Sequence, residues 1–359
     1  MNIATLALHT LYPALALASN LLAAAPEQFK QRDRNNDGVL HEGTRQEGTR
    51  TPMARPTFAD VPYGPYERTV LDFWKANSSS PTPVVVYIHG GGFVGGDKRS
   101  IPVVVVDDCL SNGVSVAAIH YRFVTTAPFP APQHDGARAI QFLRSKATGW
   151  NIDPTRIAAF GGSAGAGISL WLAFHDDLAQ TNSADPVARQ STRIACVGSF
   201  GGQPSYDPFV IKEWVGGRAY LHPSIFKCYG VPLTGSFDRA KLQPLFDECA
   251  ALTHLTKDDP PVIMFYSEPD APLPPDSPPG TGIHHPVFGH KLKKAMDDLG
   301  IESVYYHRSD FKENPHKEML AFFFRHFGMK TTAAPHAVPG AEGATAASGA
   351  EGATGATGS

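Results

Sequence analysis

RIAAFGGSAG, residues 156–165, is the stretch from which the fold of this chain can be predicted. A short apolar run is followed by Gly161-Gly162-Ser163-Ala164-Gly165, a GxSxG motif, and then by an apolar segment of helical length. A strand, a tight turn and a helix form the context in which this motif holds a nucleophilic serine. Glycines let the strand and helix approach closely, and the helix N-terminus offers N–H groups to an anion. Ser163 is therefore the predicted nucleophile, the alternative being a glycine-rich turn with a helix-capping serine.

Apolar runs and amphipathic segments alternate on both sides of this motif. The runs are predicted to be strands, and they cover residues 84–88, 115–121, 156–160, 194–200, 262–267 and 303–307. The segments predicted to be helices are 133–148, 164–180, 286–299 and 317–327. Continuous apolar strands indicate a sheet that is covered on both faces. The pattern predicts an α/β fold with a mainly parallel central sheet flanked by helices.

The composition excludes several classes of protein. Of the 359 residues 42% are hydrophobic and only 18% are charged, which argues against a disordered chain. The formal net charge is −3, so no basic field is present to hold a nucleic acid. The four cysteines, Cys109, Cys196, Cys228 and Cys249, have no CxxC spacing, so a zinc module or a disulfide-dense scaffold is not indicated.

A second glycine-rich motif follows the predicted strand at 84–88. His89-Gly90-Gly91-Gly92-Phe93 places three glycines just past the end of that strand, where they expose backbone N–H groups. Fixed amides that point at a developing oxyanion each stabilise the transition state of acyl transfer by about 3 kcal/mol. The alternative is a loop that only reverses the chain, which would make two glycine-rich strand ends a coincidence.

With these two motifs the sequence resembles the α/β-hydrolase-fold esterases, in particular the bacterial hormone-sensitive-lipase-like carboxylesterases, over residues 70–327. Further matching stretches are Tyr121-Arg122, Phe129-Pro130-Ala131, Asp135 and Asp153-Pro154-Thr155-Arg156-Ile157. One departure is Gly162, where this family usually has an acidic residue, so feruloyl- or acetyl-esterase-like groups stay open as the subfamily. The resemblance implies that His89 orients its own glycine loop and takes no proton in the reaction.

The resemblance also implies a triad in the chain order serine, acid, histidine. His316 follows the last predicted strand and is the predicted base, whereas His284-His285 precedes a helix and is expected to line the site or cap that helix. Two carboxylates, Glu268 and Asp270, follow the strand at 262–267. The resembling esterases have their acid at the position of Asp270, which is the prediction here, and Glu268 is the alternative.

These residues together predict a serine carboxylic ester hydrolase that acts on short acyl or carbohydrate esters through an acyl-enzyme. The backbone N–H groups of Gly91, Gly92 and Ala164 are expected to form the oxyanion hole. No metal and no organic cofactor is expected, and the expected partner is a small-molecule ester. The alternatives are a serine exopeptidase on the same fold and a non-catalytic hydrolase-like binding protein.

The predicted domain organisation has four parts. Residues 1–25 resemble a signal peptide without a positive n-region, which predicts export to the periplasm or medium rather than a stable membrane span. The alternative is an ordinary N-terminal segment of a cytoplasmic protein. Residues 26–54 are a linker, residues 55–330 the hydrolase domain with a cap insertion at about 201–259, and residues 331–359 a low-complexity tail expected to be disordered. The linker contains Asp33-Arg34-Asn35-Asn36-Asp37-Gly38, which fits half of a calcium-binding EF-hand loop. Thr44 stands at the twelfth position, where a carboxylate is required, so a polar turn is the preferred interpretation.

Overall fold

The computed structural model describes residues 53–311 and 314–329. The predicted signal peptide, the EF-hand-like loop and the C-terminal tail lie outside these residues and stay predictions.

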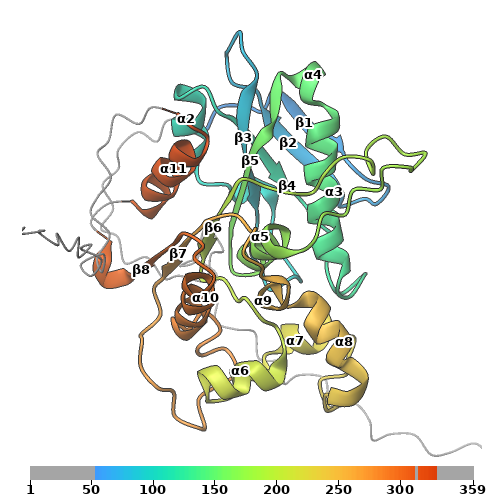
Figure 1. Ribbon diagram of the computed structural model, residues 1–359. Coiled ribbons are helices and arrows are strands. Elements are labelled where there is room, and N and C mark those ends of the chain that lie inside the picture. Colours follow the sequence, from blue (N-terminus) through green and yellow to red (C-terminus); the bar gives the residue numbers. More distant parts are fainter. Residues whose placement is uncertain (1–52, 312–313, 330–359) are drawn as a thin grey trace, which may run out of the picture. The chain divides into compact units, whose positions relative to one another are not determined.

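An eight-stranded sheet lies at the centre of the described chain (Figure 1). Its order is β1-β2-β4-β3-β5-β6-β7-β8, and the strands from β4 to β8 along this order run parallel. β1 and β2 join one edge antiparallel. The strands are β1 (Phe58–Pro62), β2 (Val70–Trp74), β3 (Thr82–Ile88), β4 (Ser115–Ile119), β5 (Ile152–Gly162), β6 (Cys196–Phe200), β7 (Val262–Tyr266) and β8 (Ser303–His307). The predicted α/β fold with a mainly parallel sheet is confirmed.

Helices cover both faces of this sheet, as the fully buried strands require. One face packs against α3 (Ala131–Ser145), α5 (Ala164–Phe174) and α10 (Val287–Asp298). The opposite face packs against α2 (Val103–Ser111) and α11 (Pro315–His326). Every residue of β3 is buried and alternate residues enter the two cores, Val84 and Val86 on the α5 side and Val85 on the α11 side. A short helix, α4 (Ala147–Trp150), leads into β5.

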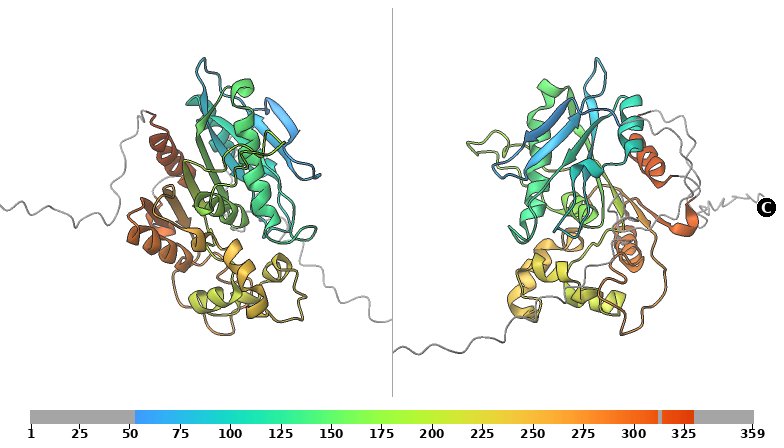
Figure 2. Two further views of the ribbon diagram at one scale, coloured as in Figure 1. Left: turned by 45° about the vertical axis from the view of Figure 1, so that its right-hand side comes forward. Right: turned by 180° about the vertical axis from the view of Figure 1, so that it is seen from behind.

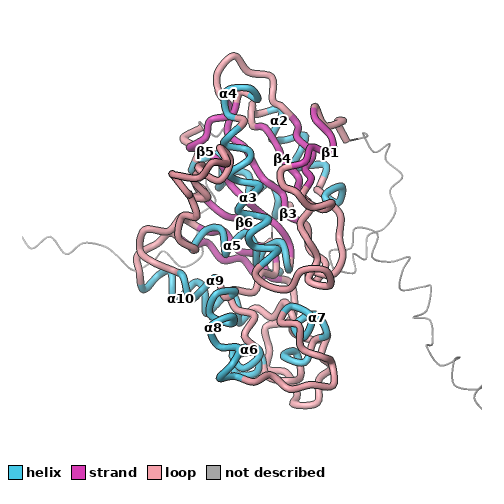
Figure 3. The backbone as a smooth tube through the Cα atoms, turned by 90° about the vertical axis from the view of Figure 1, so that its right-hand side faces the viewer, coloured by secondary structure: helices cyan, strands magenta, loops and turns pink. Residues whose placement is uncertain are grey.

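Four helices gather at the end of the sheet where the parallel strands finish, beyond α5 and α10 (Figures 2 and 3). They are α6 (Pro208–Val215), α7 (Pro223–Cys228), α8 (Arg239–Cys249) and α9 (Ala251–His254). They occupy the segment predicted to be the cap insertion, and we refer to residues 208–254 as the helical cap. Ligands of open α/β sheets bind at this end.

The differences from the predicted elements have physical reasons. β2 was not predicted because Asp72 interrupts its apolar run, and in the fold the Asp72 carboxylate accepts a hydrogen bond of 2.7 Å from Lys98 Nζ. The helix expected at 164–180 ends at Phe174, because His175 is already extended, with φ −68° and ψ 144°. The four cysteines are all buried and unpaired. Within the described ranges, no helix has the length and hydropathy needed to cross a membrane.

Candidate active site

Ser163 lies on a strained turn between β5 and α5. Its φ of 52° and ψ of −118° are rare for a residue with a side chain, and such strain costs about 1–3 kcal/mol. The Ser163 N–H donates to the carbonyl oxygen of Phe200, at the end of β6, over 2.9 Å. A side chain on Gly161 or Gly165 would collide with the carbonyl oxygen of Ile88 in β3, so both positions require glycine. The tight turn that GxSxG predicts is therefore present around Ser163.

The imidazole that contacts this serine belongs to His284. Its Nε2 lies 2.8 Å from Ser163 Oγ, although the two residues are 121 positions apart in the sequence. His284 precedes α10 and is partly buried, with 17% of its side chain exposed. Gly201 leaves room for it, because a Cβ at that position would stand 3.2 Å from His284 Cβ. The distance permits Ser163 Oγ–H to donate to His284 Nε2.

Glu268 lies on the other side of the same imidazole. Its Oε1 is 3.5 Å from His284 Nδ1 and accepts a hydrogen bond of 3.2 Å from the backbone N–H of His284. The Glu268 carbonyl oxygen is in turn 2.9 Å from Nε2 of His307, at the end of β8. The carboxylate is therefore tied to the segment that carries the histidine, in the position from which an acid orients a catalytic imidazole.

The residues that the structure brings to Ser163 are His284 and Glu268, whereas the predicted base and acid, His316 and Asp270, contact other groups. Asp270 lies past the turn at Pro269, where its Oδ2 forms an exposed pair of 2.9 Å with His290 Nε2 in α10. His316 lies at the start of α11, and its ring stacks on Phe200 at 4.8 Å between centroids. The physical reason is the path of the chain from 267 to 286, which folds back over the end of β6 and brings Glu268 and His284 to the serine.

The neighbouring histidine, His285, caps a helix. Its Nδ1 accepts from the backbone N–H of Val287 at 3.1 Å, and its Nε2 lies 3.0 Å from the carbonyl oxygen of Ala271. The sequence predicted that His284 and His285 line the site or cap the following helix. His285 contacts the first N–H of that helix, whereas His284 contacts Ser163 itself. No composition or periodicity in the sequence separates the two. The helix start that follows both histidines likewise does not separate them, and no other signal in the sequence does.

The glycine loop after β3 faces the same serine turn. Gly91 and Gly92 have φ values of +106° and +59°, which glycine adopts without strain, and Gly90 passes close to the carbonyl oxygen of Gly162. Ala164 is the first residue of α5, so its N–H has no acceptor within the helix. The three predicted oxyanion residues, Gly91, Gly92 and Ala164, therefore belong to two segments that meet at Ser163.

His89 is buried beneath this loop, as the resemblance implied. Its Nδ1–H donates to the carbonyl oxygen of Gly90 at 2.8 Å, and its ring stacks on Tyr121 at 4.4 Å between centroids. Burial lowers the pKa of His89 to about 3, so the ring is neutral at ordinary pH. The Tyr121 hydroxyl donates to the His89 carbonyl oxygen at 2.9 Å. These contacts hold the neutral His89 ring against the glycine loop.

Arg122, the residue after Tyr121, forms an ion pair with Asp135 of α3. Nη2 of Arg122 lies 2.7 Å from Oδ1 of Asp135, and the backbone N–H of Arg122 donates to Oδ2 at 2.8 Å. The side-chain hydrogen bond to Asp135 raises the pKa of Arg122 despite its partial burial. The matching YR and D positions of the sequence therefore form one buried ion pair.

The helical cap reaches the site through α7. A Cβ built on Gly92 would stand 2.7 Å from Ser224 Oγ, so Ser224 lies against the glycine loop. His222 caps α7 by accepting from the Ser224 N–H at 3.3 Å, and burial together with the nearby His284 lowers the pKa of His222. Phe226 and Tyr229 are buried in the cap, where their rings pack against Phe237 and Phe246.

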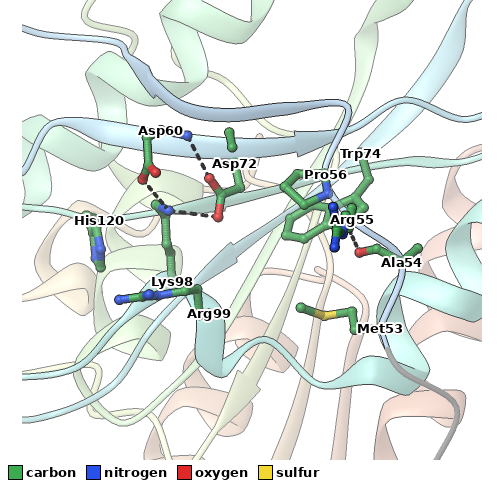
Figure 4. A pocket seen from close by; sticks show the side chains of 11 residues that line it. Met53, Ala54, Arg55, Pro56, Asp60, Asp72, Trp74, Lys98, Arg99 and His120 are labelled. Atoms are coloured by element: carbon green, nitrogen blue, oxygen red, sulfur yellow. Dashed lines mark hydrogen bonds and ion pairs between the residues drawn. The ribbon is translucent and has the colours of Figure 1, made fainter.

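A separate cavity of about 380 Å³ lies at the β1–β2 edge of the sheet (Figure 4). The Nζ of Lys98 is 2.7 Å from both Asp60 and Asp72 there. Burial acts to lower the pKa of Lys98, but the hydrogen bonds to the two carboxylates outweigh it and raise that pKa. Lys98, Asp60 and Asp72 satisfy one another in this cavity, and we interpret these three groups as a structural ion-pair cluster.

Comparisons with known proteins agree with this geometry. The BD-FAE family profile matches residues 71–278, more than half of the chain, a range that contains Ser163 and Glu268 and ends before His284. Esterase LipQ of Mycobacterium tuberculosis is 24% identical over 252 residues, covering 69% of this chain and 54% of that protein. The probable isoprenylcysteine alpha-carbonyl methylesterase ICMEL1 of Arabidopsis thaliana is 26% identical over 219 residues, covering 60% and 44%. This chain spans about half the length of these curated relatives.

Solved structures show the same fold. An acetyl ester-xyloside bifunctional hydrolase from Caldicellulosiruptor lactoaceticus superposes with a TM-score of 0.56 at 20% identity, covering 72% of this chain and 88% of its own. A carbohydrate esterase from gut microbiota superposes with a TM-score of 0.58 at 18% identity, covering 75% and 95%. From the extent of the profile match and from this shared architecture, the chain belongs to the BD-FAE family of α/β-hydrolase-fold esterases.

Proposed function

We propose that this protein hydrolyses carboxylic esters, with Ser163 as nucleophile, His284 as base and Glu268 as the acid that orients the base. The observation that carries the proposal is the 2.8 Å approach of His284 Nε2 to Ser163 Oγ on the strained turn that ends β5. Along the chain the three residues follow one another as serine, acid and histidine, the order typical of α/β-hydrolases.

The first half of the reaction forms an acyl-enzyme. His284 Nε2 accepts the Oγ proton as Ser163 Oγ attacks the ester carbonyl carbon, giving a tetrahedral intermediate with an oxyanion. The N–H groups of Gly91, Gly92 and Ala164 stabilise that oxyanion, each by about 3 kcal/mol. His284 then returns the proton to the leaving alkoxide oxygen, and the alcohol departs.

The second half regenerates the enzyme. Water attacks the acyl carbonyl and loses a proton to His284 Nε2, and the imidazolium passes this proton to Ser163 Oγ as the carboxylic acid leaves. Glu268 Oε1, 3.5 Å from His284 Nδ1, stabilises the imidazolium in both halves. Hydrogen bonds of this kind are often long before substrate binds and tighten in the transition state.

The proposed substrates are short acyl or carbohydrate esters. The close approach of Ser224 to Gly92 leaves little space on the cap side of the oxyanion loop, which supports a small acyl group. The names of the relatives, an esterase and a methylesterase among them, support an ester of this class.

The test is hydrolysis of p-nitrophenyl esters of graded acyl length, together with acetylated and feruloylated sugars. We expect turnover of the short acyl esters, and we expect Ser163→Ala to lower kcat at least about 10³-fold, because the nucleophile is removed. Circular dichroism and the unfolding midpoint of the variant should match those of the parent protein. Full activity in folded Ser163→Ala would exclude Ser163 as the nucleophile.

A further inference from the structure

A second cluster of polar side chains lies at the far end of α5. His175 directly follows α5, Glu248 lies in α8, and His254 ends α9. One ligand atom from each of these three side chains lies within 4.8 Å of the other two, and all three residues are partly buried. Two imidazoles and a carboxylate form one of the recurrent donor sets for Zn²⁺ in proteins.

Backbone contacts select the tautomers that a metal requires. His175 Nδ1 lies 2.9 Å from the carbonyl oxygen of Asp176, so Nδ1 carries the proton and Nε2 presents its lone pair. His254 Nε2 lies 2.9 Å from the carbonyl oxygen of Glu248, so Nε2 is protonated there and Nδ1 is the basic nitrogen. A metal-ligating histidine usually donates its other ring N–H to a carbonyl or carboxylate in this way.

The distances between the ligand atoms agree with a four-coordinate site in which the three side chains move slightly closer together. His175 Nε2 is 3.4 Å from Glu248 Oε1. Zn–N and Zn–O bonds of about 2.0–2.1 Å at tetrahedral angles separate two ligand atoms by about 3.3 Å. No pair of ligand atoms is more than 4.8 Å apart, so each would have to shorten by at most about 1.5 Å, which side-chain rotation can supply.

Aromatic packing holds two of the ligands in place. Trp171 lies 4.1 Å from the His175 ring and His175 lies 4.5 Å from the His254 ring, measured between centroids. The Trp171 Nε1–H also donates to the Glu248 carbonyl oxygen at 2.8 Å. The rings and the backbone of the cluster are thus positioned without an ion.

We propose that His175, Glu248 and His254 bind one Zn²⁺ ion, with water in the fourth position, as a clamp between α5 and the helical cap. The eleven residues of α5 separate the cluster from Ser163 by about 16 Å, so the ion takes no part in ester hydrolysis. It would join the end of a sheet-packed helix to α8 and α9 and stabilise the cap.

The experiment titrates Zn²⁺ into the full-length, tag-free protein after removal of metal with a chelator. We expect one equivalent to bind with a dissociation constant in the micromolar range or below, and the unfolding midpoint to rise on binding. Ca²⁺ and Mg²⁺, which prefer all-oxygen sites, should not replace it. X-ray absorption at the zinc edge should show nitrogen and oxygen neighbours at about 2.0–2.1 Å.

Variants locate the ion and separate it from other histidine sites. His175→Ala and Glu248→Gln should each weaken binding at least about 100-fold, and Glu248→Gln keeps the backbone carbonyl that Trp171 and His254 contact. The matched control His290→Ala, at the exposed pair with Asp270, should bind zinc like the parent. His284→Ala should also bind one equivalent, which excludes the active site as the zinc site.

Two results would overturn the proposal. One is the absence of any zinc binding tighter than millimolar in the folded parent protein. The cluster would then be an ion pair of His175 and Glu248 beside packed aromatic rings. The other is an equivalent of zinc that persists in folded Glu248→Gln or is lost in His284→Ala.

Discussion

Two carboxylates, Glu268 and Asp270, and several imidazoles are candidates for the acid and the base beside Ser163, and they differ in their surroundings. His284 and Glu268 are partly buried, with 17% and 27% of their side chains exposed. His284 contacts Ser163, and Glu268 contacts His284. Asp270 and His290 form a separate pair with nearly half of each side chain exposed. Water weakens the interaction within an exposed pair, so the inner pair is better placed to polarise the serine.

The base is tested by comparing two histidine variants. His284→Ala should lower kcat at least about 10³-fold, since no group then accepts the Ser163 proton, whereas His316→Ala should cost less than about tenfold. The His316 ring stacks on Phe200, and the Phe200 carbonyl oxygen accepts a hydrogen bond from the Ser163 N–H. Because this influence on Ser163 is indirect, the expected effect of His316→Ala is small. Steady-state hydrolysis of a p-nitrophenyl ester measures both. A larger loss in His316→Ala would restore the base predicted from the sequence.

The acid is tested in the same assay. Glu268→Gln should lower kcat by about 10² to 10⁴-fold, because the neutral amide no longer stabilises the imidazolium. Asp270→Asn removes a carboxylate of the same strand-end loop that faces His290 instead, and it should cost about tenfold or less. If Asp270→Asn proved the more damaging change, the acid would be Asp270 as the resemblance implied.

At the scale of elements, the approach of α5 to β3 sets the position of the nucleophile. Gly165 →Ala would drive a methyl group into the carbonyl oxygens of Ile88 and His89, backbone atoms that cannot move aside. We expect a loss of about 1–3 kcal/mol in the free energy of unfolding, and a fall of at least about tenfold in kcat as α5 shifts Ser163. Urea unfolding and ester hydrolysis measure these two effects.

Gly149→Ala is the matched control for this substitution. Gly149 lies in α4, and a Cβ there meets no atom within 4 Å. Alanine is the better helix former, so the free energy of unfolding should stay the same or rise by up to about 1 kcal/mol. Equal losses in the two variants would show that the α5–β3 contact is not what positions Ser163.

At the scale of the whole molecule, buried neutral histidines predict sensitivity to acid. Burial lowers the pKa of His89 to about 3 and of His120 to about 4, below the value of about 6.5 in an unfolded chain. As the pH falls below about 6.5, the unfolded state binds protons that the folded state excludes, down to pH values near these folded pKa values. The free energy of unfolding should therefore fall between pH 7 and pH 4, by up to about 1.4 kcal/mol per pH unit for each such histidine.

His120→Gln tests this account, because glutamine keeps an acceptor for Arg68 Nη2, which lies 3.0 Å from His120 Nδ1, and does not titrate. The slope of unfolding free energy against pH, from urea titrations between pH 4 and 7, should be shallower in the variant. An unchanged slope would show that His120 is not among the groups that make the fold acid-sensitive.

The sequence by itself determined the fold, the tight turn around Ser163 and the glycine loop. These depend on local patterns, since an apolar strand, a glycine turn and a helix are specified by neighbouring residues. The strands from β3 to β8 and the helices α3, α5, α10 and α11 were predicted for this reason. The antiparallel β1 and β2 were not, because they carry polar residues, such as Asp72 in β2, whose charge is satisfied by Lys98 from another segment.

Only the tertiary structure decided which imidazole and which carboxylate face Ser163. Spacing allowed His316 as well as His284, and Asp270 as well as Glu268, because a loop of 20 residues can place its side chains in many positions. The room beside Gly201 and the bond from the His284 N–H to Glu268 select one arrangement. Only the tertiary structure likewise brings His175, Glu248 and His254 together, because they come from the end of α5, from α8 and from α9 and have no shared spacing in the sequence.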